Sequence, residues 1–386
     1  MSHSPCGNIY DVLIVGSGPA GASAALCLAE AGVRVAVLEK ATLPRYKTCG
    51  GGVTRRALRL IPFDIQEVVE RDCFVAEMNL RDAGLHFETQ RKDPIVSMTM
   101  RDRFDSLLLS EAEKAGARIH PSCKVSDVIP HSDRVELLTS KGGFSACFVI
   151  AADGAMSTVV RRMKWPDHCR LVPALEYEVF VNDNILDRFS RSARFDFGVV
   201  PCGYGWVFPK KDHLSIGLLT MRGGTVNLNG QLDAYLRLLG ITSVRRMERH
   251  GFLIPVATRR PPLAKDRILL VGDAAGLVDP LTGEGITGAV QSGRIAARSL
   301  LGGRLKTDEV SRAYNTEIAS RIMPELETSR RLATLLYDHP KLRTLFLRLY
   351  GRRFSEAVTD IVTGDRTYRG IINDPVNYFK LLKFWG

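Results

Sequence analysis

The segment GSGPAG, at residues 16–21, constrains the fold of this chain more than any other stretch of its sequence. It matches the pattern Gly-x-Gly-x-x-Gly, whose glycines allow a tight turn, close approach of a pyrophosphate, and close packing of a helix on a strand. An apolar run at 10–15 precedes it and is typical of a buried parallel strand. An alanine-rich run at 22–31, predicted to be helical, and a second apolar run at 33–38 follow it. Together they predict a strand–helix–strand unit that binds a dinucleotide.

A carboxylate ends the second strand of this unit, at Glu39. Its position, about 20 residues after the glycines, suits hydrogen bonds from ribose hydroxyls. It argues against a 2′-phosphate at this site, because the two anions would repel each other. The helix N-terminus offers unpaired N–H groups to a pyrophosphate. At this end of the ligand we predict contacts from Gly16, Gly18, Pro19, Ala20, Gly21, Glu39 and Lys40.

Two further apolar runs also end in glycine–aspartate pairs. They are Asp153-Gly154, after the run at 146–152, and Gly272-Asp273, after the run at 267–271. Each run is short and continuous, as expected of a strand buried in a parallel sheet. A helix predicted over 283–301 begins close behind, so its N-terminus is suited to face an anionic or electron-rich ring. We therefore expect these distant segments to return to the sheet that begins at residue 10.

The segments between these motifs follow helix-like and strand-like patterns. Residues 171–254 are rich in β-branched and aromatic residues and predict a large antiparallel sheet. Residues 308–386 are predicted to be mostly helical and basic. The other predicted helices are 55–69 and 101–115, and the other predicted strands lie within 74–100, 118–130 and 135–140.

The predicted fold class is α/β, or α+β overall, with a discontinuous Rossmann-like domain that carries an insertion. The nucleotide-binding domain is predicted to comprise residues 1–73, 101–165 and 261–307. An inserted antiparallel-sheet domain that binds substrate comprises 74–100 and 166–260. A C-terminal helical segment covers 308–386.

Composition limits the partners of the chain. The formal net charge of +11 favours an anionic partner, such as a phosphorylated substrate or an acidic membrane surface, over a neutral one. The sequence contains no stripe of basic residues interleaved with aromatic ones, the pattern that would predict nucleic-acid binding. The eight cysteines include no CxxC pair and no metal-ligand spacing, which predicts reduced thiols without a metal. We expect a cytoplasmic protein, in peripheral contact with membranes through the tail YFKLLKFWG, unless that tail packs on its own domain.

Taken in this order, the motifs resemble the flavoprotein superfamily whose fold is that of para-hydroxybenzoate hydroxylase. The resemblance implies that FAD is the dinucleotide, with its ADP part on the first glycine motif. It assigns Asp273 to the ribityl and pyrophosphate region, and Arg101 to the pyrophosphate. Further contacts implied by the resemblance are Asp153, Gly154, Gly272, Pro280, Gly283, Gly285 and Ile286.

Two segments are similar to one branch of that superfamily, the geranylgeranyl reductase family. PRYKTCGGG, at residues 44–52, resembles its P-x-x-K-x-C-G-G segment, and YGWVFPK, at 204–210, resembles its Y-x-W-x-F-P signature. Gly217 matches the first glycine of a following Gly-x-Gly, but Leu219 stands where the second glycine would be. The resemblance implies a reductase that saturates C=C bonds of an isoprenoid chain. The implied electron donor is NAD(P)H, ferredoxin or another reductant.

The residue types in these two segments suit such a reaction. Tyr204, Trp206 and Phe208 alternate, so on a strand they point to one face. With Pro209 they form either an aromatic wall for a prenyl chain or a part of the core. Lys47, beside Arg45, is placed either to hold an anionic head group or to remain a solvated loop charge.

Cys49 is the residue of the glycine-rich loop that bears on the chemistry, and Gly50 and Gly51 are expected beside the flavin with it. An isolated C=C bond accepts hydride poorly, so its reduction needs a proton delivered together with hydride. Cys49 is then a general acid, a redox thiol or a packing thiol. The alternative function is an FAD-dependent monooxygenase or halogenase of an aromatic or polyketide substrate.

Overall fold

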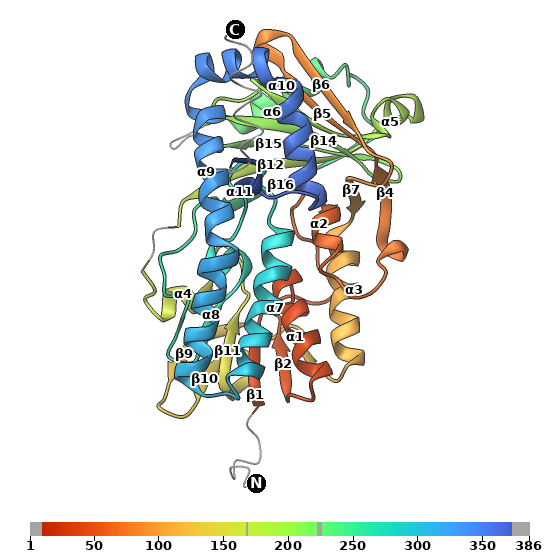
Figure 1. Cartoon of the computed structure of the whole chain (residues 1–386). Coiled ribbons are helices and arrows are strands. Elements are labelled where there is room, and N and C mark those ends of the chain that lie inside the picture. The colour runs from red at the N-terminus through yellow and green to blue at the C-terminus, as the bar shows by residue number, and fades with distance from the viewer. Residues whose placement is uncertain (1–9, 167–168, 222–225, 373–386) are drawn as a thin grey trace.

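The computed structural model describes residues 10–166, 169–221 and 226–372. Figure 1 shows two sheets stacked along the long axis of the molecule, with helices against each of them. The parallel sheet that contains β1 (Tyr10–Val15) lies in the lower half of the view, and a larger sheet lies in the upper half.

The lower sheet has the parallel order β18-β11-β1-β2-β8 at its centre. The sequence of β1 shows no alternation of apolar and polar residues, because the strand is buried in the sheet and covered by helices. Val12, Leu13 and Ile14 are fully buried. The antiparallel strands β9, β10 and β17 extend this sheet at β11 and β18. Its other strands are β2 (Val35–Leu38), β8 (Arg118–His120), β9 (Val125–Pro130), β10 (Val135–Thr139), β11 (Gly142–Ala151), β17 (Ala264–Lys265) and β18 (Ile268–Leu270).

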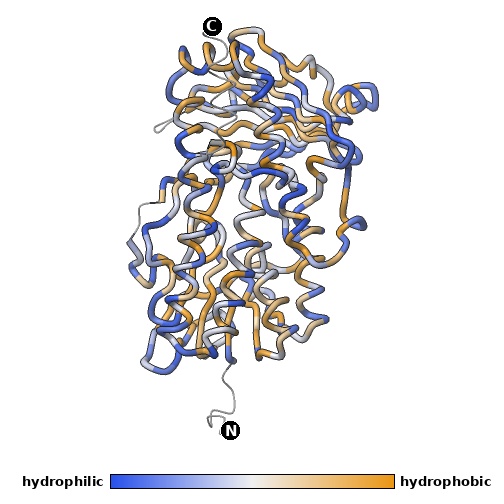
Figure 2. The backbone as a smooth tube through the Cα atoms, in the orientation of Figure 1, coloured by the Kyte–Doolittle hydropathy of each residue, from blue (hydrophilic) through white to orange (hydrophobic). Residues whose placement is uncertain are grey.

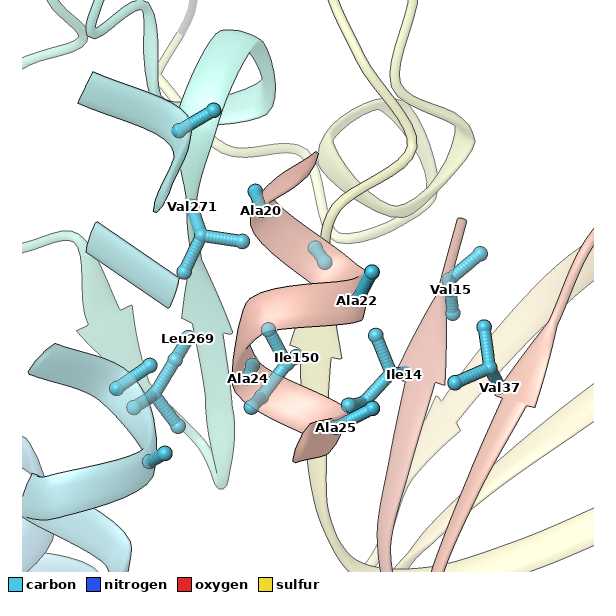
Figure 3. Packing of buried hydrophobic residues seen from close by; sticks show 14 of the residues in the cluster. Ile14, Val15, Ala20, Ala22, Ala24, Ala25, Val37, Ile150, Leu269 and Val271 are labelled. Atoms are coloured by element: carbon cyan, nitrogen blue, oxygen red, sulfur yellow. The ribbon is translucent and has the colours of Figure 1, made fainter. Parts of the chain in front are cut away.

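Small residues let two helices pack tightly beside this sheet. The alanines of α1 (Pro19–Glu30) lie against Ile14 of β1 and Leu269 of β18, as Figure 3 shows. A Cβ atom on Gly293 of α7 (Ile286–Gly302) would stand 2.2 Å from the Ala20 carbonyl oxygen, so the two helices meet at a glycine. Helices α3 (Arg101–Lys114), α4 (Thr158–Arg162) and α8 (Thr307–Arg321) complete this half.

The upper sheet has seven strands in the order β16-β12-β15-β14-β13-β5-β6, antiparallel except where β5 pairs with β13. One face packs against α5 (Asp183–Phe189) and α6 (Leu228–Leu238), and the other against α9 (Met323–Asp338) and α10 (Pro340–Thr363). The apolar residues of these strands appear as orange stretches in Figure 2. The strands are β5 (Val75–Leu80), β6 (Leu85–Gln90), β12 (Leu171–Phe180), β13 (Ser192–Phe197), β14 (Gly203–Pro209), β15 (Leu214–Thr220) and β16 (Arg246–Pro255).

A small third sheet joins the two halves, and it corrects part of the sequence prediction. It consists of β3 (Gly52–Thr54), β4 (Val69–Cys73) and β7 (Val96–Thr99). The helix predicted over 55–69 is wrong beyond its first turn, α2 (Arg55–Leu58), apart from a 3₁₀ turn at Gln66–Val68. Pro62 explains the interruption, because it lacks an N–H group and restricts the residue before it.

The C-terminal helical prediction is confirmed for the residues that the structure describes. Helices α9 (Met323–Asp338), α10 (Pro340–Thr363) and α11 (Tyr368–Ile372) follow α8. The aromatic–basic tail lies outside the described residues. Within the described ranges no helix has the length and apolar content to cross a membrane. Helices α5 and α6 were not predicted, because aromatic and β-branched residues surround them in the sequence. The domain limits and peripheral membrane contact stay predictions.

We predict that Gly217→Ala destabilises the protein. The new Cβ atom would lie 2.0 Å from Cζ2 of the Trp206 indole, which fills the space beside β15. Overpacking of this kind costs about 1–3 kcal/mol of unfolding free energy. Gly251→Ala, on β16 of the same sheet, is the matched control because its Cβ atom meets nothing closer than 3.9 Å. Denaturant unfolding measures both variants, and equal stabilities would contradict the packing described here.

Candidate functional site

A large cavity, with a volume of about 850 Å³, lies between the two main sheets. At one end its wall includes the glycine motif of β1–α1 and the end of β2. At the other end it is formed by the inward face of the upper sheet and by α10. The loop 45–52 lies in the wall between them. Its size falls within the range of ligand and cofactor sites.

Two glycines of the GSGPAG motif are required by the protein's own packing. A Cβ atom on Gly16, which has φ +102°, would stand 2.4 Å from the Ala152 carbonyl oxygen. One on Gly21 would stand 2.0 Å from the Gly16 carbonyl oxygen. These contacts allow the tight turn and the close helix–strand approach that the motif predicts.

Gly18 has no such packing reason. The nearest atom to its added Cβ is Nη2 of Arg45, at 3.6 Å, and its side faces the cavity. Gly18 is also the N-cap of α1, with Pro19 as the first helical residue. Open space at a helix N-terminus fits an incoming pyrophosphate, so these residues fit the ADP half of FAD.

A chain of buried charges runs from this motif toward the loop. Glu39 accepts hydrogen bonds from the Ser17 N–H at 3.0 Å and the Ser17 hydroxyl at 2.7 Å. Arg45 lies 3.4 Å from Glu39 and 3.2 Å from Asp105. Asp105 in turn binds Arg101 through two hydrogen bonds, of 2.8 and 2.9 Å. Arg45 is thus engaged by two carboxylates and is not a free loop charge.

The pKa values in this network follow from its pairing. Burial favours the neutral form of Glu39, but the hydrogen bonds from Ser17 and Ala41 and the charge of Arg45 lower its pKa below the ordinary value. Burial likewise opposes the charge of Arg101, but the charge of Asp105 outweighs burial and raises the pKa of Arg101 above its ordinary value. Both ends of the network therefore stay ionised at neutral pH.

The two glycine–aspartate pairs have different surroundings. Asp153 accepts hydrogen bonds from the Ser157 hydroxyl, at 2.5 Å, and the Thr158 N–H, at 2.6 Å, and so caps α4 while lining the cavity. Asp273 lines the cavity beside Lys47 and Arg101. Burial raises the pKa of Asp273, and those two cations oppose the shift.

The glycine-rich loop packs directly on the aromatic strand β14. A Cβ atom on Gly50 would lie 2.7 Å from the Phe208 ring, and one on Gly51, at φ +66°, would lie 2.0 Å from the Thr99 carbonyl oxygen. Protein contacts therefore already require glycine at both positions. Cys49 precedes them in the cavity wall, where its sulfur accepts the Gly51 N–H at 3.4 Å.

Lys210 holds the loop in this position, and sequence reasoning missed it. Its side chain is completely buried, and its ammonium donates to the Gly50 carbonyl at 2.7 Å and the Thr99 carbonyl at 2.9 Å. Burial lowers the pKa of Lys210, and the carboxylates of Glu178 and Glu176 counteract this. Its place directly after YGWVFP was the available signal.

The far end of the cavity is largely apolar. Tyr204, Trp206 and Phe208 line it from one strand, as their alternation predicts. Tyr204 donates a hydrogen bond of 2.5 Å to the Thr282 carbonyl. Leu219 lies close to Gly283, because a Cβ atom added to Gly283 would stand 3.2 Å from Cδ2 of Leu219. The apolar wall is completed from β5, β13 and α10 by Ala76, Met78, Ala193, Phe195, Phe197, Phe354, Val358 and Val362.

Most of the predicted site residues line this one cavity. Lys40, Lys47, Gly154, Gly285 and Ile286 are among them. The exceptions are Gly21, Pro209, Gly272 and Pro280, which do not form part of its wall. Gly21 and Gly272 instead pack against neighbouring backbone or side chains, and Pro209 pairs with Leu214. In the described ranges no cluster of three or more histidine, cysteine or acidic residues is arranged to hold a metal ion.

The chain is similar to known proteins. The family model described as an FAD binding domain matches residues 9–187. Menaquinone reductase of Mycobacterium tuberculosis is 30% identical over 84% of each chain. The chloroplastic geranylgeranyl diphosphate reductase of Oryza sativa is 28% identical, over 92% of this chain and 81% of its own.

Solved structures agree in fold. A geranylgeranyl bacteriochlorophyll reductase-like protein of Thermoplasma acidophilum superposes with a TM-score of 0.76 and 24% identity, over 92% of both chains. The halogenase PltM, in complex with phloroglucinol and FAD, has a TM-score of 0.69 and 20% identity, over 92% of this chain and 83% of its own.

The fold and its cavity thus define an FAD-dependent oxidoreductase. Within that class, this chain belongs to the geranylgeranyl reductase family of the para-hydroxybenzoate hydroxylase-like flavoproteins. The predicted fold class and family are confirmed.

We predict that Gly18→Ala weakens FAD binding without unfolding the protein. Its methyl group would enter the open side of the motif, so we expect at least about a tenfold higher Kd, equivalent to 1.4 kcal/mol. Gly21→Ala is the contrasting variant, because its methyl group collides with the Gly16 carbonyl and should lower thermal stability itself. Flavin fluorescence titration and thermal melting separate the two effects. Unchanged FAD affinity in Gly18→Ala would contradict the placement of the pyrophosphate.

We predict that Lys210→Met loosens the glycine-rich loop. It leaves the Gly50 and Thr99 carbonyls without their buried donor, which costs about 3 kcal/mol of unfolding free energy. Lys211→Met, at the exposed neighbouring position, is the control and should leave stability unchanged. Denaturant unfolding gives the stability, and hydrogen exchange at Gly50–Gly52 reports on the loop. Equal protection in both variants would contradict the role of Lys210.

Proposed function

We propose that this protein is an FAD-dependent reductase that saturates C=C bonds of an isoprenoid chain. The observation that carries the proposal is the continuity of one cavity. Its first end fits a dinucleotide, and its other end is an apolar, aromatic-lined chamber. The loop with Cys49 lies at the junction, where a flavin ring and a substrate bond would meet.

The apolar end suits a prenyl chain because of its composition. Its wall comes from the upper sheet and from α10, with carbon-rich side chains on both sides. Transfer of each CH₂ group from water to such a wall contributes about 0.8 kcal/mol, so a long hydrocarbon binds without any charged contact. The aromatic faces add shape selectivity, because a flat alkene stacks well on a ring.

In this proposal the residues of the chain orient the reactants while bound FAD supplies hydride chemistry. Cys49 forms the wall beside the reacting bond. Tyr204, Trp206 and Phe208 hold the chain, and Pro209 supports the strand that carries them. Lys47 holds an anionic group at the junction. Burial lowers the pKa of Lys47 to about 8, and its ammonium lies 3.0 Å from the centroid of the Phe252 ring.

The relatives' names point to the class of substrate. The rice relative is named for reduction of geranylgeranyl diphosphate and the mycobacterial one for reduction of menaquinone. Both compounds carry a polyprenyl chain, so we propose a prenyl diphosphate, prenyl lipid or quinone tail as substrate. We propose NAD(P)H or ferredoxin as the electron donor and peripheral contact with the membrane that holds the lipid.

Anaerobic turnover tests this proposal. The FAD-loaded protein is reduced with dithionite, freed of the excess reductant and mixed with geranylgeranyl diphosphate. We expect the flavin to be reoxidised and the substrate mass to rise by two hydrogens for each bond saturated. Oxygen-dependent turnover with insertion of oxygen or halide would instead establish the monooxygenase or halogenase alternative. Failure to take up FAD would overturn both.

We predict that Val358→Trp blocks the prenyl end and spares the flavin end. Val358 lines the cavity from α10, and an indole there would fill space meant for the chain. The expected result is a KM for a long prenyl substrate raised at least about tenfold, equivalent to 1.4 kcal/mol, with FAD affinity unchanged. Leu349→Trp, on the same helix but 64% exposed, is the control. Equal kinetics in the two variants would place the chain elsewhere.

A further inference from the structure

Glu176 is a carboxyl group set in the inward face of the upper sheet. It lies on β12, is 1% exposed and lines the cavity together with Ala174 of the same strand and the rings of β14. Its Oε1 accepts a hydrogen bond from the Ser215 hydroxyl, while its Oε2 has no hydrogen-bond partner in the described part of the chain. A buried carboxylate with an unpaired oxygen is costly, whereas the neutral acid needs less solvation.

The surroundings of Glu176 favour its acid form. Burial, and then the charge of Glu178, raise the pKa of Glu176 to about 7, against the opposing effect of Ser215 and Lys210. The Cys49 N–H faces the same carboxyl, which places Glu176 directly behind the loop at the junction. The titratable and charged groups that face it from neighbouring elements are Tyr46, Cys49, Glu178, Lys210, His213 and His250.

A line of polar groups leads from Glu176 toward solvent. Ser215, which donates to Glu176, is the cross-strand partner of Glu178. His213 lies 3.0 Å from Glu178 through Nε2, an ion-pair contact whose angle is not that of a hydrogen bond, and 2.7 Å from Asp212 through Nδ1. Asp212 is at the surface, with 70% of its side chain exposed.

His213 is suited to carry a proton along this line. Burial opposes its charge, but Glu178 and Asp212 outweigh that effect and raise the pKa of His213 above its ordinary value. Its imidazole is therefore placed to pass a proton between an exposed and a buried carboxylate.

We propose that Glu176 is the catalytic acid of the reduction and that Glu178 and His213 return its proton from solvent. This inference rests on the proposed function. One alkene carbon receives hydride from the reduced cofactor, which is thereby oxidised, and the other receives the proton of Glu176. The C=C π bond and the O–H bond break, two C–H bonds form, and a Glu176 carboxylate remains. His213 and Glu178 then supply one solvent proton to that carboxylate.

An infrared titration of the FAD-loaded protein tests the first part of this proposal without turnover. We expect the carbonyl band of a protonated carboxyl to disappear as the pH rises through about 7. Glu176→Gln should remove that band. Glu88→Gln, an exposed position on β6 of the same sheet, should retain it. A wild-type protein without the band, or a band that survives in Glu176→Gln, overturns the proposal.

Rapid mixing of the reduced protein with a prenyl substrate tests the second part. In a single turnover Glu176→Gln should oxidise its flavin about 100-fold more slowly than wild type, as loss of a general acid predicts. The wild-type rate should fall as the pH rises through about 7, because only the acid form has a proton to give. His213→Gln should keep the first turnover near the wild-type rate, because Glu176 is already protonated in this variant. Only the later turnovers should be slower.

Two outcomes of that experiment overturn the inference. One is a normal single-turnover rate in Glu176→Gln with the wild-type pH profile. The other is an equal loss in first and later turnovers of His213→Gln while its FAD absorbance and melting temperature match wild type. If wild type itself reduces no prenyl substrate, the proposed function fails, and the infrared titration still decides whether Glu176 stores a proton.

Discussion

The buried ammonium of Lys210 is the contact on which the arrangement of the site depends. It sits where the strand of the aromatic wall ends and donates to carbonyls of the glycine-rich loop and of β7. A lysine without exposed surface is stable only when acceptors and nearby carboxylates compensate for lost hydration. Because the pairing is specific, it ties three segments that are distant in the sequence to one register. The loop then has a single position between the two ends of the cavity.

The two ends of that cavity differ in the physics that shapes them. At the nucleotide end, charges are paired in series from Glu39 through Arg45 and Asp105 to Arg101, so the wall is polar and stays ionised. At the chain end, rings and aliphatic side chains from β14, β13 and α10 leave a space with little polarity. The proposed reduction of a prenyl chain needs both environments in contact, since a charged cofactor and a hydrocarbon must share one reaction site.

Glycines mark the places where these layers approach most closely. Gly50 and Gly51 admit Phe208 and the Thr99 carbonyl, and Gly217 admits the indole of Trp206. Gly50 and Gly51 were expected beside the flavin, but protein contacts already account for glycine at both positions. Gly18 is different, because no packing contact explains it and its open side faces the cavity.

The sequence by itself determined the strand–helix–strand unit, the family and part of the cavity wall, because glycine geometry and apolar periodicity are local properties. It also indicated that Tyr204, Trp206 and Phe208 share a face, since alternation along a strand requires it. Only the tertiary structure decided that Lys210 and Glu176 meet the Cys49 loop. Burial and pairing between residues more than a hundred positions apart set these features, and no local pattern encodes them.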